Sequence, residues 1–192
     1  MSSAARGSTH PEHAPWLAHY PAGVDWSLPL APSTLPALFD AAIGRFGPKT
    51  AANFLGRTTT YADLGRQVAR TAAGLQRAGV GKGTKVGLLL PNCVPYIVYY
   101  FAVQKLGGVI VNYNPLYTVE ELGHQIRDSG TELMVTLDLK PLFDKVENLL
   151  ETGVLARAAV VHFPPLLPGR DWPDPAKRLI WRLYDGLIQA LL

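Results

Sequence analysis

The apolar and polar positions of the chain fall into ordered blocks, and the longest of these runs from Thr84 to Leu122. Its first apolar run, Val86–Leu90, has the length and composition of a strand that is buried on both faces. Asn92 is placed to cap the helix that follows, and Pro95 falls in the first turn, where a missing N–H costs little. A pair of glycines ends this helix before a second apolar run, Val109–Val111. Two apolar strands joined by one helix predict a parallel βαβ unit with a right-handed crossover.

Strand and helix periods alternate through the rest of the chain as well. Two short strands, Ala51–Leu55 and Thr58–Tyr61, are predicted on either side of a Gly56-Arg57 turn and form a hairpin. Asp63 is expected to open a long helix, and Thr118 with Glu121 forms a capping box at the start of another. Further strands are predicted at Leu133–Leu137 and Ala158–Phe163. Further helices are predicted after a cap at Ser33 or Thr34, ending at Phe46, and from Pro141 to Leu150. This alternation predicts an α/β fold, with an open, doubly wound, mostly parallel sheet flanked by helices.

Composition places the chain among globular proteins. Of its 192 residues, 48% are hydrophobic and 17% are charged, and the net charge of +3 is mild. No dense block of Lys and Arg is present, so nucleic acid is not an expected partner. Arg66, Arg70 and Arg77 share one helical stripe. A solvated helix face is the favoured interpretation of this stripe, and a contact with phosphate or lipid is the alternative.

Local chemistry offers no catalytic or metal-binding cluster. Cys93 is the only cysteine, so it excludes an internal disulfide and fits a reducing, cytoplasmic location. Its apolar neighbours favour a packed thiol over a nucleophile. His124 has no partner at metal-ligand spacing, and a structural histidine is the favoured interpretation. The Gly81-Lys82-Gly83 run lacks the spacing of a phosphate-binding loop and precedes a strand, so a plain turn is expected.

Four regions are predicted along the chain. Residues 1–32 form an extended N-terminal arm, 33–163 an α/β subdomain, 164–175 a proline-rich loop and 176–192 an amphipathic helix. The last helix is expected to continue further, because it reaches Leu192 without a cap. Packing against protein is the favoured interpretation of its apolar face, whereas a membrane surface is the alternative, with four candidate contacts: Lys177, Arg178, Trp181 and Arg182.

Three segments resemble motifs of the adenylate-forming enzymes. Thr58–Gln76, TTTYADLGRQVARTAAGLQ, resembles the first core motif, usually written L-T/S-Y-x-E/D-L. Val103–Leu122, VQKLGGVIVNYNPLYTVEEL, resembles the second, L-K-x-G-G/A-x-x-x-P, and between them GVGKGTKVGLLLPN is similar to G-V-x-K-G-D-x-V-x-x-x-x-P-N. Within this superfamily, the Asn-Pro-Leu-Tyr-Thr run and the proline-rich loop after Phe163 look most like bacterial long-chain fatty acid–CoA ligases. The resemblance covers about residues 33–192.

The resemblance implies a two-step reaction that uses ATP, Mg²⁺ and coenzyme A. A fatty acid carboxylate attacks the α-phosphate of ATP to give an acyl-adenylate and pyrophosphate, and the thiol of coenzyme A then displaces AMP. The family's Ser/Thr/Gly-rich phosphate loop, adenine-binding Tyr-Gly-x-Thr-Glu segment, ribose-binding Asp and catalytic Lys are absent from these residues. The chain is therefore expected to be an incomplete N-terminal part of the large domain. It would be inactive alone, with no catalytic residue of its own and the missing C-terminal portion as its partner.

Candidate substrate contacts are few. Asn112, Asn114 and Tyr117 follow a strand at the edge where α/β sheets bind ligands, although shaping the loop is their favoured role. Tyr99 lies in an aromatic helix that could border an acyl tunnel, with core packing as the favoured interpretation.

The sequence leaves several alternatives open. The alternative functions are an aryl- or medium-chain-CoA ligase and a non-catalytic module that docks on a partner or on the inner face of the membrane. The oligomeric state is also open, and a homodimer is one possibility. A dinucleotide-binding oxidoreductase is disfavoured, because no G-x-G-x-x-G follows a strand.

Overall fold

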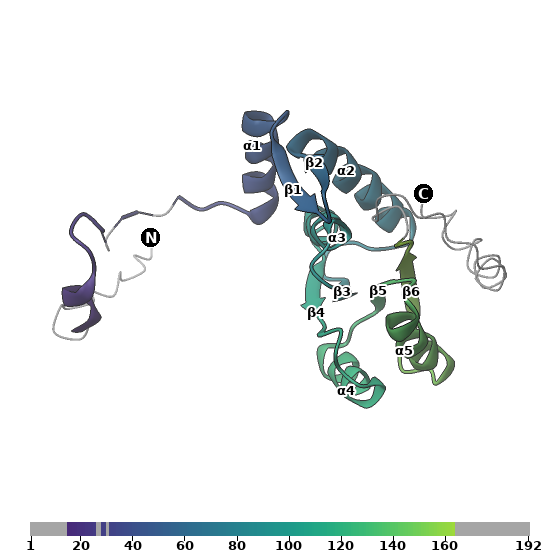
Figure 1. The fold of residues 1–192 in the computed structure, drawn as a ribbon. Coiled ribbons are helices and arrows are strands. Elements are labelled where there is room, and N and C mark those ends of the chain that lie inside the picture. Colours follow the sequence, from purple (N-terminus) through teal and green to yellow (C-terminus); the bar gives the residue numbers. More distant parts are fainter. Residues whose placement is uncertain (1–14, 26–27, 30, 164–192) are drawn as a thin grey trace, which may run out of the picture. The chain divides into compact units, whose positions relative to one another are not determined.

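A computed structural model describes residues 15–25, 28–29 and 31–163 (Figure 1). The predicted proline-rich loop at 164–175 and the predicted terminal helix at 176–192 lie outside the described residues, as do the four candidate membrane contacts: Lys177, Arg178, Trp181 and Arg182. The chain divides into two units, Met1–Ser33 and Thr34–Leu192. The described part of the first unit contains a short 3-10 helix, η2 (Pro15–His19), which the sequence did not predict.

The second unit begins with a helix and a hairpin. Thr34 caps α1 (Leu35–Phe46), and its hydroxyl accepts a hydrogen bond from the Ala37 N–H at 3.2 Å. The strands β1 (Thr50–Phe54) and β2 (Arg57–Thr60) pair antiparallel. The predicted turn at Gly56-Arg57 was one residue late, because Leu55 and Gly56 have the positive φ values of 51° and 85° that a two-residue hairpin turn requires.

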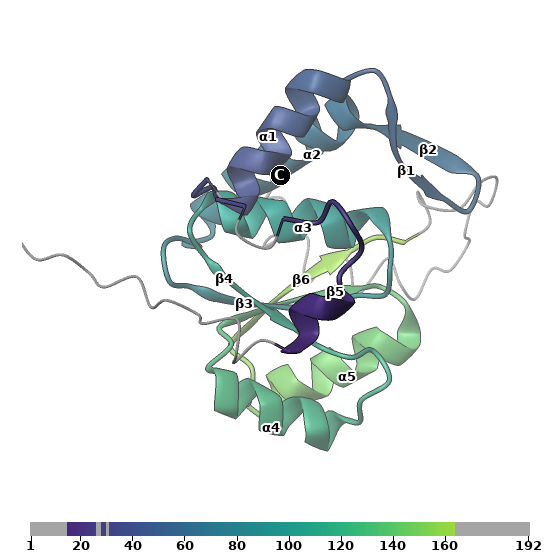
Figure 2. The same ribbon diagram turned by 90° about the vertical axis from the view of Figure 1, so that its left-hand side faces the viewer.

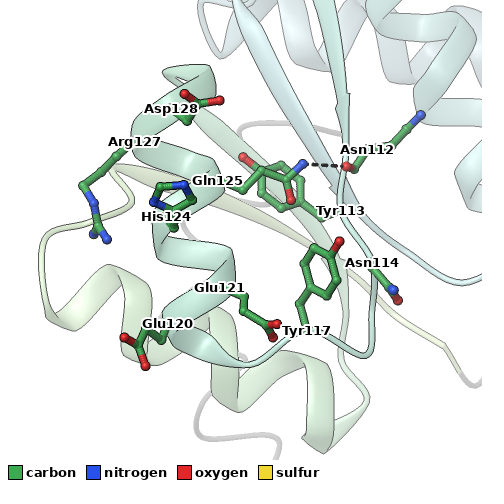
Figure 3. A pocket seen from close by; sticks show the side chains of 10 residues that line it. All are labelled: Asn112, Tyr113, Asn114, Tyr117, Glu120, Glu121, His124, Gln125, Arg127 and Asp128. Atoms are coloured by element: carbon green, nitrogen blue, oxygen red, sulfur yellow. Dashed lines mark hydrogen bonds between the residues drawn. The ribbon is translucent and has the colours of Figure 1, made fainter.

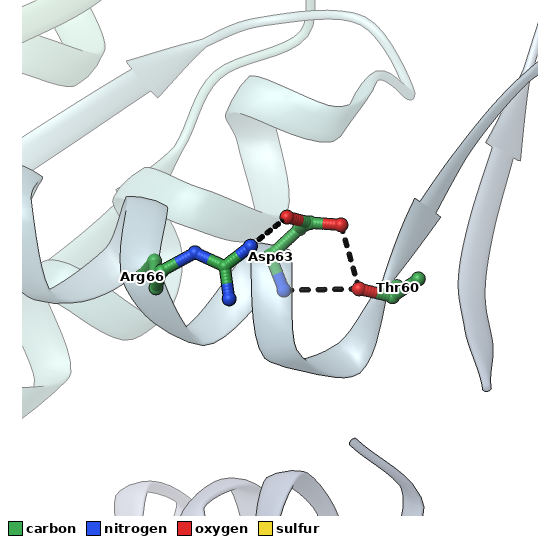
Figure 4. A network of polar contacts seen from close by, with 3 residues as sticks. All are labelled: Thr60, Asp63 and Arg66. Atoms are coloured by element: carbon green, nitrogen blue, oxygen red, sulfur yellow. Dashed lines mark hydrogen bonds and ion pairs between the residues drawn. The ribbon is translucent and has the colours of Figure 1, made fainter. Parts of the chain in front are cut away.

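The second helix, α2 (Tyr61–Arg77), begins two residues before the predicted start at Asp63. Thr60 is the cap: its hydroxyl oxygen accepts from the Asp63 N–H at 3.1 Å and donates to the Asp63 carboxylate at 2.7 Å (Figure 4). Arg66 completes this cluster with an ion pair to Asp63. The hydrogen bond from Thr60 is the main reason why the pKa of Asp63 is lowered. The threonine therefore fixes where the chain enters the helix.

Four parallel strands form the central sheet in the order β4-β3-β5-β6. Gly87 of β3 lies opposite Val111 of β4 and Met134 of β5. This arrangement confirms the predicted βαβ unit and the parallel sheet. In chain order the elements are β3 (Lys85–Leu89), α3 (Val94–Lys105), β4 (Val109–Asn112), α4 (Val119–Ser129), β5 (Leu133–Leu137), α5 (Lys140–Glu151) and β6 (Arg157–Val161).

Helices cover both faces of the sheet, which confirms the doubly wound architecture. Figure 2 shows α3 against one face with α1 and α2 beyond it, and α4 with α5 against the other face. The middle strands are accordingly apolar, and Leu88, Leu89 and Leu137 are completely buried. The aromatic helix α3 is covered on more than one side, since Phe101 stacks on Phe39 of α1 at a centroid distance of 4.0 Å. None of the described helices is long and apolar enough to cross a membrane.

The predicted N-cap of α3 was wrong, whereas the predicted capping box of α4 was correct. Cys93, not Asn92, is the N-cap of α3, and it makes no side-chain cap bond. Pro95 in the first turn lowers the number of N–H groups that need a cap. Cys93 is buried, and burial raises the pKa of its thiol, in agreement with the predicted packed role. The capping box of Thr118 and Glu121 is present at α4.

Candidate functional site

The loop between β4 and α4 carries three of the predicted substrate contacts. Asn112 ends the edge strand β4, and two neighbouring helices hold it. The Tyr96 hydroxyl of α3 donates to Asn112 Oδ1 at 2.9 Å, and the Gln125 amide of α4 donates to the Asn112 carbonyl at 3.0 Å. The end of β4 is therefore fixed to both helical layers.

Asn114 shapes the loop through local hydrogen bonds. Its side-chain oxygen accepts from the Leu116 N–H at 3.0 Å, and its carbonyl accepts from the Tyr117 N–H at 3.0 Å. This is the turn chemistry that asparagine favours, in which the side chain mimics a backbone turn. Leu116 is 87% exposed at the tip of this turn, and Tyr117 is partly exposed beside it.

Lys145 of α5 holds the same loop from outside. Its ammonium group donates to the carbonyls of Pro115 and Tyr117, at 3.0 and 2.7 Å. The loop then enters α4 through the capping box, in which Glu121 accepts from the Thr118 N–H at 2.8 Å. Hydrogen bonds from Thr118 are the main cause of a lowered pKa at Glu121, and the positive charge of Lys145 adds to the effect. Lys145 thus joins α5, the loop and the start of α4.

Replacing Lys145 with methionine is expected to loosen this loop. The change removes two charge-assisted hydrogen bonds from a half-buried group, and we expect a loss of about 1–2 kcal/mol in the free energy of unfolding. The Tyr117 amide should exchange its hydrogen faster, as measured by NMR. Lys140→Met is the matched control, because the Lys140 side chain is 78% exposed and, among the described residues, forms its ion pair with Asp144 of its own helix. Equal exchange at Tyr117 in the two variants would show that Lys145 does not hold the loop.

An open hollow of about 840 Å³ lies over the loop and α4, and we call it the β4–α4 hollow (Figure 3). Tyr117 rises from the loop toward Gln125, whereas His124 projects from α4 on the other side of the hollow. One acceptor, Gln125 Oε1, is buried and has no partner among the described residues. The lining residues are Asn112, Tyr113, Asn114, Tyr117, Glu120, Glu121, His124, Gln125, Arg127 and Asp128.

The charge of the β4–α4 hollow does not suit the implied cofactors. Three carboxylates face one arginine along its lining: Glu120, Glu121, Asp128 and Arg127. A net negative lining opposes a triphosphate or a carboxylate. The described residues also contain no group of three His, Cys, Asp or Glu side chains that could hold a metal ion. The hollow therefore does not fit ATP, Mg²⁺ or the phosphates of coenzyme A, and no step of a reaction is assigned to it.

A buried hydroxyl cluster supports the hollow from beneath. The Tyr113 hydroxyl lies 2.7 Å from Thr131 Oγ1 and 3.1 Å from Ser129 Oγ, which are 2.9 Å from each other. The Tyr113 ring fits over the sheet because Gly87 has no side chain: a Cβ there would lie 2.7 Å from Tyr113 Cε2. The Tyr113 ring therefore occupies the space that a side chain at position 87 would fill.

Tyr99, the fourth predicted contact, lies elsewhere. It is not among the residues that line the β4–α4 hollow, and its ring packs against the hydrophobic core. Burial raises the pKa of its phenol to about 12. The structure therefore brings Asn112, Asn114 and Tyr117 together and leaves Tyr99 with the core.

A second, smaller hollow was missed by the sequence analysis. In the order β4-β3-β5-β6 the chain reverses direction across the sheet between β3 and β5, and ligands in open α/β sheets bind at such a switch point. An apolar hollow of about 270 Å³ lies near the carboxyl end of β3. Its lining comes from β1 and the start of α3, and no local pattern shows that these elements meet, so nothing in the sequence pointed to it. Its lining consists of Ala52, Asn53, Phe54, Asn92, Cys93, Val94, Tyr96 and Ile97.

Asp138 and His162 form a pair just after the carboxyl ends of β5 and β6. Asp138 lies 2.5 Å from His162 Nδ1, and its other oxygen accepts from the Phe163 N–H at 2.8 Å. The Phe163 ring meets Phe54 edge-on at a centroid distance of 6.5 Å. The pair ties the chain after β6 to β5, and sequence reasoning had assigned no role to either residue.

Comparison with known proteins identifies the family. The AMP-binding enzyme family matches residues 39–179. A long-chain-fatty-acid–CoA ligase of Bacillus subtilis is 36% identical over 154 residues, which are 80% of this chain and 27% of that protein. A 4-coumarate–CoA ligase of Arabidopsis thaliana is 41% identical over 100 residues, 52% of this chain and 17% of that protein. The crystal structure of a long-chain-fatty-acid-CoA ligase from Archaeoglobus fulgidus superposes with a TM-score of 0.63 at 28% identity, covering 70% of this chain and 28% of that one.

The chain belongs to the family of AMP-binding enzymes. This membership confirms the resemblance drawn from the motifs around Tyr61 and Gly107. The chain spans only about a third or less of the curated relatives that it matches, with 27% of the Bacillus subtilis protein covered.

Proposed function

We propose that this chain forms the N-terminal portion of a long-chain fatty acid–CoA ligase. The complete enzyme would join a fatty acid to ATP, release pyrophosphate, and pass the acyl group to coenzyme A with release of AMP. The observation that carries the proposal is the family match over residues 39–179 together with the similarity to the Bacillus subtilis ligase. The motif order in the sequence supports the same assignment.

The described residues would serve as scaffold rather than catalyst. They supply a parallel sheet and two helical layers, and neither hollow carries a positively charged phosphate site. ATP, Mg²⁺ and coenzyme A would therefore be held by residues other than the described ones, and the metal would neutralise phosphate charge. We expect the 192-residue chain to have no ligase activity alone.

Three residues at the end of β4 and in the loop after it remain candidates for contact with a substrate. Asn112, Asn114 and Tyr117 present uncharged groups at the end of β4. Because the surrounding carboxylates oppose an anion, we propose that they touch an uncharged part of a ligand. The complete enzyme would work in the cytoplasm, and the basic segment with Lys177 and Arg182 would reach the inner face of the membrane, where fatty acids are supplied.

The acid preference of the native protein tests this proposal. The protein that carries this segment would be isolated from its own cells and supplied with ATP, coenzyme A and either a long-chain fatty acid or 4-coumarate. Formation of a long-chain acyl-CoA at a rate at least tenfold above the aryl product is expected. The reverse preference would replace the proposal with an aryl-CoA ligase, which the similarity to 4-coumarate–CoA ligase favours.

The mass of the same native protein tests the non-catalytic alternative. The chain itself has a mass of 20.9 kDa. A mass well above this value is expected, because the relatives are much longer. A native mass equal to 20.9 kDa would contradict the ligase proposal and favour a module that docks on a membrane or a partner.

A further inference from the structure

The positive charge of the chain is unevenly distributed along the α/β unit. Residues 34–80, which form α1, the hairpin and α2, contain six Lys and Arg but only two Asp and Glu. Residues 81–163 contain seven Lys and Arg against eight Asp and Glu. The sheet and its following helices are thus close to neutral, whereas the first helical layer is basic.

Both acidic residues of the basic layer already have partners. Asp40 binds Lys105 of α3 through both carboxylate oxygens, each at 2.7 Å. Asp63 is held by Thr60 and Arg66 at the start of α2 (Figure 4). Among the residues that the structure describes, no carboxylate forms an ion pair with Arg70 or Arg77. No described carboxylate therefore neutralises these two charges.

Arg66, Arg70 and Arg77 lie on the solvent side of α2. All three are exposed, and their positions share one helical stripe. The opposite side of α2 is buried through Leu64, Val68 and Leu75, so the arginine stripe faces away from the core. With a rise of 1.5 Å per residue, the stripe extends for about 16 Å along the helix.

This geometry suits a surface with many separate anions. Neither hollow described above is lined by these arginines, so neither hollow gathers them around a single small ligand. A guanidinium group binds a phosphate through two parallel hydrogen bonds, and a row of them on one side of a helix can contact several phosphates at once. Basic helix faces bind anionic lipid surfaces through this attraction.

We propose that the arginine stripe of α2, formed by Arg66, Arg70 and Arg77, docks on an anionic phospholipid surface. The positive charge of the stripe complements the negative headgroups of such a surface. A lipid is favoured over nucleic acid because the sequence has no dense block of Lys and Arg. This contact is separate from the one assigned to the segment around Lys177, and it does not depend on the ligase reaction.

Vesicle binding by the 192-residue chain tests the stripe. Vesicles of phosphatidylcholine with phosphatidylglycerol should bind the chain, pure phosphatidylcholine should bind it weakly, and added salt should weaken the binding. The triple variant R66Q/R70Q/R77Q should lower the partition coefficient on the order of a hundredfold. This estimate assumes that each basic side chain near the membrane surface strengthens binding about fivefold. Circular dichroism and thermal unfolding check that this variant folds like the parent.

Two variants with the same change in net charge separate the sources of binding. K82Q/K85Q/K140Q removes three exposed charges outside α2 and should retain most of the binding. K177Q/R178Q/R182Q removes the C-terminal charges. Loss of binding in the C-terminal variant with full binding in the α2 variant would overturn the proposal. Equal losses in the α2 variant and in K82Q/K85Q/K140Q would overturn it as well, because net charge alone would then explain the binding.

A competitor distinguishes lipid from nucleic acid. Duplex DNA at equal phosphate concentration should not displace the chain from anionic vesicles. Binding of the parent chain to DNA through the same three arginines, with no binding to the vesicles, would replace the lipid surface by nucleic acid and reject the proposal.

Discussion

Gly87→Ala is expected to lower the free energy of unfolding by about 2–3 kcal/mol, the cost of overpacking a filled core. A Cβ at this position would lie 2.7 Å from Tyr113 Cε2 and 2.8 Å from Met134 Sδ. Both neighbours are almost fully buried, so neither ring nor thioether has free space to enter. Displacing Tyr113 would also break the hydroxyl cluster with Thr131. Denaturant unfolding measures the loss.

Gly81→Ala is the matched control for that change. Gly81 precedes β3 in the chain, has no positive φ, and has no atom within 4 Å of an added Cβ. Its replacement should change the free energy of unfolding by less than about 0.5 kcal/mol. Similar losses in both variants would mean that the space over Gly87 is not limiting, and the explanation of the Tyr113 position would be wrong.

Gly108→Ala should have an effect of similar size, for a different reason. Gly108 is the second glycine of the motif between α3 and β4, and its N–H donates to the Val103 carbonyl at 3.0 Å. An added Cβ would lie 2.7 Å from Val103 Cγ1 and 3.2 Å from the Thr84 carbonyl oxygen. The Thr84 carbonyl oxygen accepts a hydrogen bond from the Val109 N–H, so it cannot move away from the added Cβ without losing that bond. A loss of about 2–3 kcal/mol in unfolding free energy is expected.

Gly123→Ala tests whether the effect belongs to the position rather than to glycine in general. Gly123 lies inside α4, and an added Cβ would meet its nearest atom, Arg127 Nη1, at 3.4 Å. Alanine is the better helix former, so this variant should gain up to about 1 kcal/mol. A gain at Gly108 as well would show that the motif glycine is not required by packing.

Most of the fold follows from local patterns. The strand β5 has its predicted bounds, Leu133–Leu137, because a run of apolar residues lies between polar residues on both sides. The capping box at Thr118 was also predicted, since both of its partners are three residues apart. The start of α2 was missed because Thr60 and Asp63 can each begin a helix, and only the backbone shows which residue caps it.

The candidate site was predictable only in part. Asn112 ends β4, and Asn114 and Tyr117 follow it on the next loop, so a predicted strand end was enough to find them. Lys145 and Tyr96 were not found, because their contacts with Pro115 and Asn112 join elements far apart in the chain. The smaller hollow lies between β1 and the start of α3, and local periodicity does not show that these two elements meet. The contacts that the sequence did not predict are therefore those between elements that are distant in the chain.

Formation of AMP by the native protein tests the central claim most directly. The protein that carries this segment, isolated from its own cells, would be incubated with ATP, a long-chain fatty acid and coenzyme A, and the nucleotide products would be separated. An AMP-forming ligase predicts AMP and acyl-CoA in equal amounts, only when the fatty acid is present. Formation of ADP, or no nucleotide product that depends on the fatty acid, would contradict the assignment.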